Sequence, residues 1–370
     1  MDKTEMLIRK KFREYYEKNF VKGPSNISSR EFGFGGWDKK IESRHFSFLN
    51  EKELNGYLAR NAPLYISYSA AQYRYPTAPM DKKEWICAEL IFDIDANEVG
   101  SECTKIHGKN WVCEKCMEKT KEAAQRLIEE FLIKDFGVKK EEIEVNFSGN
   151  RGYHIHLTAG FENLGGYARR EIADYINGKG LKYEDLFVES KESKRTIGPK
   201  PTDGGWKGKI ANIFIEKIKQ HDLESIGVHP KIANKFYSQS TIRDIENGNW
   251  NRVYISNRKK FFENILEKIN KTYSGNIDEQ VTMDTTKLIR LPDSIHGETG
   301  MVAKRIKNLD KFEPFEDPVV FGDNFMEVYV KNTPKITLKN QTFGPFKDQL
   351  VGLPEYAAIY LLCKKVAELR

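Results

Sequence analysis

Hydrophobic residues follow two different spacings along this chain, and these spacings predict a mixture of helices and strands. Apolar positions recur every three or four residues over 3–20 and 118–135, which is typical of helices that bury one face. The last stretch, 356–369, has the same amphipathic spacing. Short segments with strand-like patterns predict strands at 30–34, 45–48, 64–69, 89–96, 143–147 and 153–158.

The order of these segments predicts one α+β core interrupted by a helical insertion. Residues 163–275 are rich in lysine and have helical spacing, whereas strand-like segments return at 277–291. Because strands lie on both sides of the helical stretch, we expect residues 1–162 and 276–370 to form the core. Residues 163–275 would then be the insertion, and two tandem domains are the less favoured arrangement.

Composition narrows the class of protein. The 370 residues are 39% apolar and 31% charged, as in soluble globular proteins. No apolar run reaches the roughly 18 residues of a membrane helix, and the charged N-terminus lacks a signal-peptide core. We therefore expect an intracellular protein with no membrane partner. The net charge of +6 and the pI of about 8.8 permit a polyanionic partner without requiring one.

Two aspartates on one predicted strand are the sharpest chemical feature. In Phe92-Asp93-Ile94-Asp95 the carboxylates of Asp93 and Asp95 point to the same face, because strand residues two apart share a face. Carboxylates held this close repel each other unless a cation lies between them, and Mg²⁺ or Mn²⁺ suits such oxygen ligands. Asp278 is the candidate third ligand. A solvated face of an edge strand is the structural alternative.

Cysteine spacing predicts a second metal site. Cys103, His107, Cys113 and Cys116 bring thiolate and imidazole groups together over a short stretch, the ligand types that tetrahedral Zn²⁺ prefers. Four protein ligands leave no open position, so the expected role is structural. His107 is the weakest of the four ligands, and water or Asp135 could replace it. Free cysteines beside a surface histidine are the alternative.

A glycine-rich turn predicts contacts with phosphate. Residues 148–152 join two predicted strands and contain two glycines, which let backbone amides approach an anion closely. Arg151 adds a planar guanidinium for phosphate oxygens. His154 and His156 share one strand face, and of these His156 is the one expected only to pack.

The segment 287–297 would add more groups to an anion site. It contributes Arg290 and His296, on either side of Leu291-Pro292. The structural alternative is a strand that ends in a proline turn with exposed polar residues.

Taken in order, these motifs resemble the small catalytic subunit of archaeo-eukaryotic DNA primases. Each motif is short, but their order and spacing are specific, and the resemblance spans nearly the whole chain. The motifs are Arg30–Phe32, Phe92–Asp95, the Cys/His cluster, Ser148–His154 and Ile277–Gly300. The resemblance implies a prim-type mixed α/β catalytic core over residues 1–162 and 276–370, with a zinc knuckle at 103–116 and the helical insertion at 163–275.

The resemblance also implies roles for single residues. The residues implied to bind the catalytic Mg²⁺ or Mn²⁺ are Asp93, Asp95 and Asp278. Those implied to contact the nucleotide triphosphate are Ser148, Arg151, His154, Arg290 and His296. Arg30 and Glu31 match a motif near the incoming nucleotides. Glu298 departs from the pattern, because a lysine is common in the family two residues after the histidine that matches His296. Either Arg151 and Arg290 bind more of the triphosphate here, or Glu298 points away.

The implied activity is template-directed synthesis of short primers on single-stranded DNA by two-metal phosphoryl transfer, with ribo- or deoxyribonucleotides as substrates. The implied partner is a primase large regulatory subunit. Three other functions stay open: a repair polymerase that extends supplied primers, a two-metal nuclease, and a non-catalytic zinc-bearing nucleic-acid adaptor.

Overall fold

The computed structural model describes residues 2–100, 102–189, 195–251, 255 and 257–369. The predicted α+β class is confirmed, since helices alternate with strands that form several separate sheets. The chain divides into two compact units. The first comprises 1–125, 139–171 and 276–370, and the second comprises 126–138 and 172–275. The predicted core, residues 1–162 and 276–370, and the predicted insertion, residues 163–275, stay a prediction.

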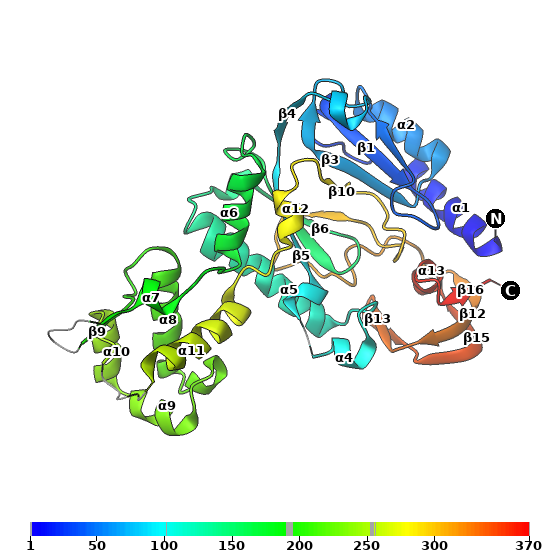
Figure 1. Cartoon of the computed structure of the whole chain (residues 1–370). Helices are drawn as coiled ribbons and strands as arrows, with labels where there is room; N and C mark the ends of the chain where they lie inside the picture. Colours follow the sequence, from blue (N-terminus) through cyan, green and yellow to red (C-terminus); the bar gives the residue numbers. More distant parts are fainter. Residues whose placement is uncertain (1, 101, 190–194, 252–254, 256, 370) are drawn as a thin grey trace. The chain divides into compact units, whose positions relative to one another are not determined.

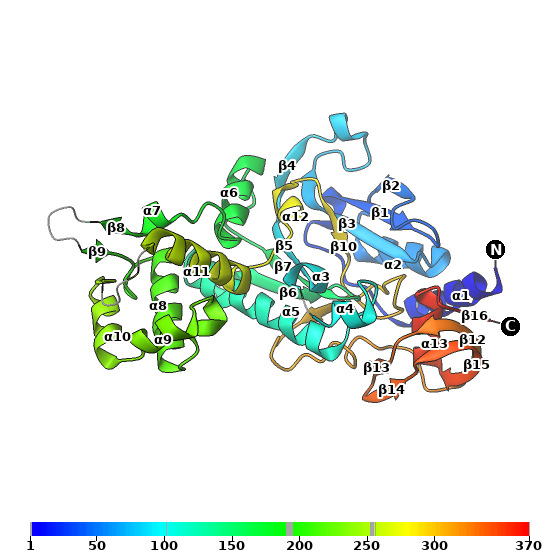
Figure 2. The same cartoon turned by 60° about the horizontal axis from the view of Figure 1, so that its bottom comes forward.

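The first sheet of the larger unit is antiparallel and is built from the N-terminal part of the chain (Figure 1). Its strands follow the order β10-β3-β1-β2. β4 also pairs with β3, at a different part of that strand from the part that pairs with β10. Helices α1 and α2 accompany it with their apolar residues buried, and of the two only α1 falls in a stretch, 3–20, whose spacing predicted a helix. Figure 2 shows α2 beside β1 and β3. The bounds are α1 (Lys3–Lys18), β1 (Arg30–Gly35), β2 (Ser43–Phe46), α2 (Glu51–Asn61), β3 (Tyr65–Tyr73), β4 (Trp85–Ala88) and β10 (Leu288–Arg290).

The second sheet carries most of the predicted site residues. Its order is β11-β6-β7-β5, and β7 pairs antiparallel with both β5 and β6. Phe92 and Ile94 are fully buried on β5, so the predicted division of this strand into an apolar and a carboxylate face is observed. The bounds are β5 (Leu90–Asp95), β6 (Ile143–Phe147), β7 (Gly152–Leu157) and β11 (Lys304–Ile306).

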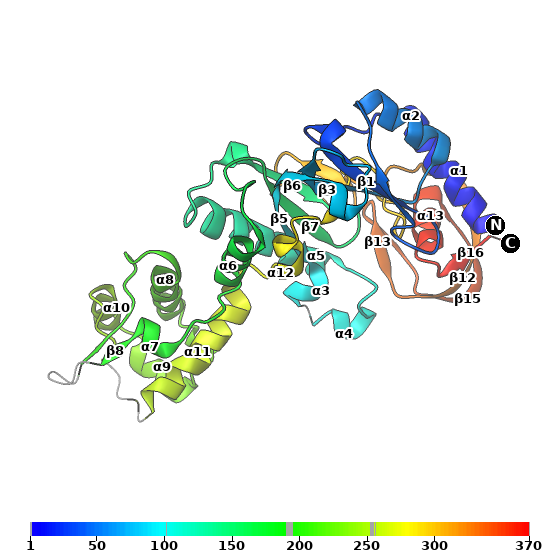
Figure 3. The ribbon, with the colours of Figure 1, turned by 45° about the horizontal axis from the view of Figure 1, so that its top comes forward.

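Short helices follow β5 and lead into the long predicted helix (Figure 3). They are α3 (Ala96–Val99), α4 (Thr104–His107) and α5 (Glu114–Arg126), and α5 continues as a π-helical segment, Leu127–Ile133. The apolar residues along this stretch include four that are fully buried, whereas Ile128 is partly exposed. The four are Ala124, Leu127, Phe131 and Leu132.

Two predictions near the C-terminal end were wrong in detail. Part of the strand-like stretch 277–291 is a short helix, α12 (Glu279–Met283), before β10. The predicted amphipathic helix at 356–369 is α13 (Glu355–Cys363), which is buried on all sides and is followed by a strand, β16 (Ala367–Glu368). It packs against β12 (Phe325–Thr333) and β15 (Phe346–Pro354), so no face of α13 needs to be polar.

The larger unit also contains a short hairpin and the start of α6. β13 (Ile336–Leu338) and β14 (Gln341–Phe343) form a separate hairpin. The two ends of the chain meet, since the Leu369 amide donates to Thr4 Oγ1 at 3.2 Å. Figure 1 shows both termini beside α1 and β16. α6 (Gly166–Ile176) begins in this unit and ends in the other.

The smaller unit is predominantly helical, in keeping with the spacing over 163–275. Its core is a cluster of aromatic rings in which Phe187, Trp250 and Phe262 contact one another. The bounds of its helices and short strands are α7 (Tyr183–Leu186), β8 (Val188–Glu189), β9 (Thr196–Ile197), α8 (Gly205–Lys219), α9 (Pro230–Phe236), α10 (Gln239–Glu246) and α11 (Arg258–Tyr273). Across the described part of the chain, no helix combines the length and apolarity that a membrane span needs.

Candidate active site and metal centre

Three aspartates from two distant parts of the chain meet at the end of β5. Asp93 lies opposite His154 of β7, and Asp95 lies opposite Gly152. Asp278 caps the N-terminus of α12, where its Oδ1 accepts from the Gln280 amide at 2.8 Å. The Asp278 amide donates to the Asp93 carbonyl oxygen at 2.9 Å. This backbone bond places the third carboxylate beside the strand that carries the other two.

Burial and neighbouring carboxylates raise the pKa of two acidic side chains in this cluster. Burial, together with the charges on Asp95, Glu98 and Asp278, raises the pKa of Asp93 to about 8. Partial desolvation and the charges on Asp278 and Asp95 raise the pKa of Glu98 to about 7. An acidic cluster of this kind has the donor set and the unbalanced charge that suit a divalent cation with oxygen ligands.

Without divalent metal, Asp93→Asn is expected to stabilise the fold at alkaline pH. Because the pKa of Asp93 is higher in the folded chain than its ordinary value of 3.8, the folded state binds more protons. The free energy of unfolding therefore falls as pH rises through about 4 to 8, and asparagine removes this loss. In EDTA, calorimetry should give a variant Tm about 2–4 °C above the parent at pH 9, with a smaller gap at pH 6. A gap that does not change with pH would contradict the raised pKa of Asp93.

The glycine-rich turn at residues 148–152 is shaped by its own side chains and by close packing. Ser148 Oγ accepts from the Gly152 amide at 3.2 Å, which closes the turn. Gly149 has a φ of +82°, and a Cβ there would lie 2.9 Å from the Cβ of His296. The turn therefore packs directly on the segment that carries His296. Arg151 Nε donates to Asp95 Oδ2 at 2.7 Å, so in this state the guanidinium is paired with a carboxylate.

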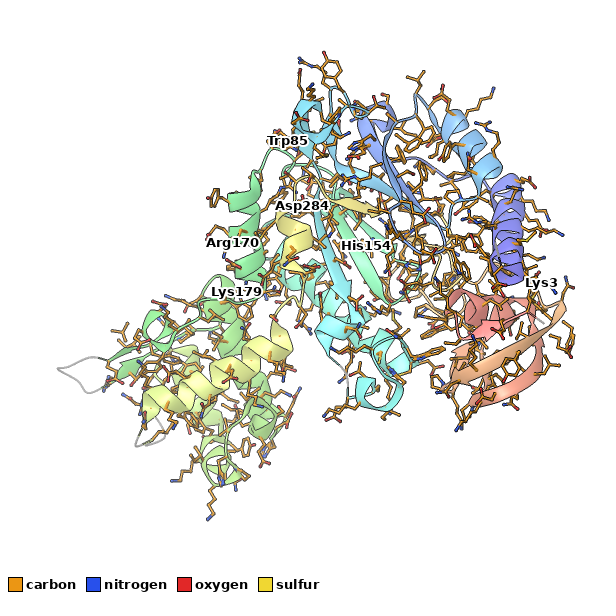
Figure 4. All side chains as sticks on the ribbon, turned by 45° about the vertical axis from the view of Figure 1, so that its right-hand side comes forward. Lys3, Trp85, His154, Arg170, Lys179 and Asp284 are labelled. Atoms are coloured by element: carbon orange, nitrogen blue, oxygen red, sulfur yellow. The ribbon has the colours of Figure 1, made fainter. Side chains whose placement is uncertain are left out.

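The two histidines of β7 have different surroundings. His154 Nε2 lies 3.7 Å from Asp93 Oδ1, and Figure 4 shows His154 on the sheet that carries the aspartates. Burial, with smaller effects from His156, Arg290 and Lys287, lowers the pKa of His154 to about 3. His154 is therefore a neutral ring at physiological pH. His156 Nδ1 lies 3.0 Å from Glu89 Oε2 and the ring is buried, as expected for a packing residue.

Arg290 and His296 reach the same region from β10 and the loop after it. The Arg290 guanidinium lies 5.1 Å from the centre of the Tyr65 ring. His296 Nδ1 accepts from the Glu298 amide at 3.1 Å. Burial and nearby cations, Arg290 first, lower the pKa of His296, so its ring is neutral. Because Nδ1 is an acceptor, the proton lies on Nε2, where it can be donated to an anion.

All eight residues predicted for the catalytic and nucleotide-binding sites line one cavity of about 330 Å³ in the larger unit. They are Asp93, Asp95, Ser148, Arg151, His154, Asp278, Arg290 and His296. The cavity has carboxylates at the end of β5 and cationic or neutral hydrogen-bond donors on the turn and on β10. Such a cavity can hold a divalent cation and a phosphate-bearing molecule together.

The cysteine cluster forms a separate centre around α4 and α5. The Sγ atoms of Cys103, Cys113 and Cys116 lie within 4.8 Å of one another and could hold a metal ion such as Zn²⁺. The Cys113 and Cys116 sulfurs are 3.6 Å apart, close to the ~3.8 Å expected between two thiolates on one tetrahedral Zn²⁺. His107 Nε2 lies 3.3 Å from Cys116 Sγ. The donor chemistry and spacing therefore fit zinc.

The alternative ligand Asp135 is engaged elsewhere. Its carboxylate accepts from Lys209 Nζ at 2.8 Å and from the Tyr175 hydroxyl at 2.8 Å. These contacts lie within the helical unit and form a buried ion pair. Asp135 is thus accounted for by the packing of that unit.

Comparison with known proteins agrees with these motifs. The family model described as DNA primase small subunit matches residues 92–307. A relative from Methanothrix thermoacetophila, named DNA primase small subunit PriS, is 35% identical over 99% of this chain and 99% of its own length.

This chain belongs to the DNA primase small subunit family.

Other members of the family share the same extent of similarity. The PriS of Methanococcoides burtonii is 33% identical over 99% of this chain and 98% of its own length. The PriS of Archaeoglobus fulgidus is 32% identical, covering 98% of this chain and 97% of its own length. The likeness therefore includes both units and not only the segment around β5.

In this DNA primase small subunit family member, two residues of the family motif expected near incoming nucleotides are not among those that line the cavity. The side chains of Arg30 and Glu31 are fully buried. Arg30 donates to the Ser69 carbonyl oxygen and pairs with Glu89, whereas Glu31 pairs with Arg44 at 3.0 Å. These contacts hold β1 against β3 and the adjacent segments. The two side chains therefore stabilise the first sheet.

Two cavity-lining lysines were not predicted. Lys40 comes from the connection between β1 and β2, and Lys287 precedes β10. Neither stands in a pattern that distinguishes it from the many surface lysines, so sequence spacing carried no signal for them. Glu298 also lies at this end of the cavity, where its Oε1 is 2.8 Å from Lys40 Nζ.

Proposed function

We propose that this chain is the catalytic subunit of a DNA primase, a nucleotidyltransferase that joins nucleotides into short primers on single-stranded DNA. The observation that carries the proposal is the single cavity in which three aspartates face two arginines and two neutral histidines. Membership of the family supports the substrate class. Both ribo- and deoxyribonucleotides are candidate substrates, giving RNA or DNA polymerase activity.

In this proposal Asp93, Asp95 and Asp278 hold Mg²⁺ or Mn²⁺. The bound ions would lower the charge repulsion between the attacking 3′-hydroxyl, the α-phosphate and the leaving pyrophosphate. The proposal is supported by the raised pKa of Asp93, whose cause is burial beside other carboxylates. Asp95 would have to exchange its bond with Arg151 for a cation, which would release the guanidinium toward phosphate.

The remaining cavity residues would hold the triphosphate. His296 would donate from Nε2, because its Nδ1 is already an acceptor. Arg151 and Arg290 would each offer a planar pair of N–H groups to phosphate oxygens. Ser148 would act by closing the turn that presents backbone amides. Their combined effect would be to align the α-phosphate for attack, since positioning supplies much of the rate in phosphoryl transfer.

The other predicted parts have supporting roles. Cys103, His107, Cys113 and Cys116 would hold a structural Zn²⁺ as a knuckle at residues 103–116, beside the core formed by 1–162 and 276–370. The insertion, residues 163–275, is the candidate surface for the large regulatory subunit. Template sequence would be read by base pairing, so the protein would contact the strand through lysine and arginine, and binding should weaken as salt rises.

The decisive experiment supplies the purified chain with Mn²⁺ or Mg²⁺, nucleoside triphosphates and a single-stranded template without primer. We expect short oligonucleotides whose sequence follows the template. Products that form only when a primer is added would favour the repair polymerase. Release of mononucleotides without added triphosphates would favour the nuclease, and template binding without either product would favour the adaptor.

A further inference from the structure

Lys40 stands on a tightly built turn at the mouth of the cavity. In the connection between β1 and β2, the Gly36 amide donates to the Lys39 carbonyl oxygen at 3.1 Å and the Glu42 amide donates to the Phe34 carbonyl oxygen at 2.8 Å. A Cβ on Gly35 would lie only 2.3 Å from the Lys40 carbonyl oxygen, so this approach requires glycine. The backbone of Lys40 is thus fixed, although its side chain is 61% exposed.

A lysine in the C-terminal part of the core also contacts this turn. Lys365 Nζ donates to the Trp37 carbonyl oxygen at 2.6 Å and lies 4.7 Å from the centre of the Trp37 ring. These contacts do not involve Lys40 or Glu298. The backbone at Lys40 therefore keeps its place whichever partner the lysine side chain has.

Glu298 connects Lys40 to the phosphate-facing turn. One Glu298 oxygen lies 2.8 Å from Lys40 Nζ, and the other accepts from Asn150 Nδ2 at 3.0 Å. Asn150 Oδ1 in turn accepts from Lys364 Nζ at 3.4 Å. Glu298 is therefore held by the 148–152 turn, and it holds the flexible end of Lys40 beside that turn.

The carboxylate of Glu298 lies among several cations and partly neutralises their charge. Burial would raise the pKa of Glu298, but the hydrogen bond from Lys40 and the charges of Lys40, Lys364 and Arg151 keep that pKa below its usual value. Burial, with Arg151 and Lys40, lowers the pKa of Lys364 to about 8. The cations repel one another, and Glu298 offsets that repulsion. A polyphosphate carries more charge than one carboxylate and would compete with Glu298 for the exposed ammonium.

We propose that Lys40 binds the polyphosphate of the incoming nucleotide, and that Glu298 holds Lys40 at the cavity mouth until that phosphate displaces it. The identity of the ligand rests on the function proposed above. The contact itself rests on the placement of Lys40 in the lining of the cavity that contains Arg151, Arg290 and His296.

The first test measures equilibrium binding of ATP and AMP in Mn²⁺ without template. Lys40→Met should raise the Kd for ATP about 5- to 10-fold, because one charged contact is lost, and should change the Kd for AMP less. Lys39→Met is the matched control, since Lys39 is exposed and is absent from the cavity lining. It should change the Kd for ATP less than about twofold. Equal ATP affinity for Lys40→Met and the parent would overturn the proposal.

A second variant tests whether charge at this point is what matters. A lysine at position 298 would place an ammonium close to where the Lys40 side chain ends, because the two groups are in contact. Adding Glu298→Lys to Lys40→Met should therefore return the Kd for ATP to within about threefold of the parent value. A double variant that folds, as judged by its Tm, but binds ATP no better than Lys40→Met would overturn the proposal.

Primer synthesis by the same proteins separates this inference from the proposed function. If the parent makes primers and Lys40→Met binds ATP normally, only the assignment of Lys40 fails. If the parent makes no primers but its ATP affinity depends on Lys40, the proposed function fails and the phosphate contact stands. If both hold, the KM for nucleotide should rise in Lys40→Met more than kcat falls.

Discussion

Replacing Asp93 with asparagine is expected to lower primer synthesis at least about a thousandfold. Asparagine keeps the size of the side chain and the pairing of β5 with β7, but it removes a negative ligand from the cluster that also contains Asp95 and Asp278. The measurement is the initial rate of oligonucleotide formation in Mn²⁺ on unprimed single-stranded DNA. Asp93 is preferred to Asp95 for this test, because the Asp95 carboxylate also accepts a hydrogen bond from the Asn97 amide and pairs with Arg151. Replacing Asp95 would therefore remove these contacts as well.

The control for this experiment is Asp81→Asn. Asp81 is exposed and is not among the cavity-lining residues. Its replacement should leave the rate within about twofold of the parent. Calorimetry should show a folded Asp93→Asn protein, so that lost activity is not lost structure. An Asp93→Asn protein that polymerises near the parent rate would show that the aspartates do not hold the catalytic ions.

Replacing Cys116 with alanine is expected to remove bound zinc and to lower the Tm by about 5 °C or more. Cys116 is buried in the first turn of α5, and its sulfur lies beside both Cys113 and His107. Loss of one ligand leaves an incomplete tetrahedral set, and folding no longer gains the free energy of metal binding. Zinc content per chain and the Tm measure the two effects.

Cys87→Ala is the matched control for the zinc experiment. Cys87 lies on β4, outside the cluster of three sulfurs, so this variant should keep its zinc. A Cys116→Ala protein that still binds one zinc per chain would show that another group takes its place. Only a loss of zinc with Cys116→Ala, and not with Cys87→Ala, supports the proposed knuckle.

The cysteine cluster is connected to the cavity by the residues between His107 and Cys113. The Lys109 carbonyl oxygen accepts from Arg151 Nη1 at 3.4 Å, and the Asn110 carbonyl oxygen accepts from Lys364 Nζ at 3.0 Å. Lys364 also belongs to the group of cations around Glu298. A metal that orders this segment would therefore help to orient Arg151. We expect zinc loss to weaken nucleotide binding as well as stability.

Sequence spacing was most informative where all the residues belong to one local element. The alternation on β5 indicates that Asp93 and Asp95 share a face, because the period of a strand is two. The glycines of the 148–152 turn and the cysteine pair at 113 and 116 are likewise short-range patterns. In such cases the backbone geometry alone decides which side chains lie together, so the motif could be read without knowing the packing.

The sequence by itself determined the α+β class, the family and the short motifs, because local periodicity and residue chemistry carry that information. Only the tertiary structure decided which distant groups meet. Asp278 joins Asp93 through a backbone hydrogen bond, and Lys40 reaches Glu298 from another sheet connection. It also decided burial, which encloses the side chain of Arg30 and covers α13 on every side. The physical reason is that contacts between separate elements, and the loss of water that sets charge and pKa, depend on packing and not on spacing along the chain.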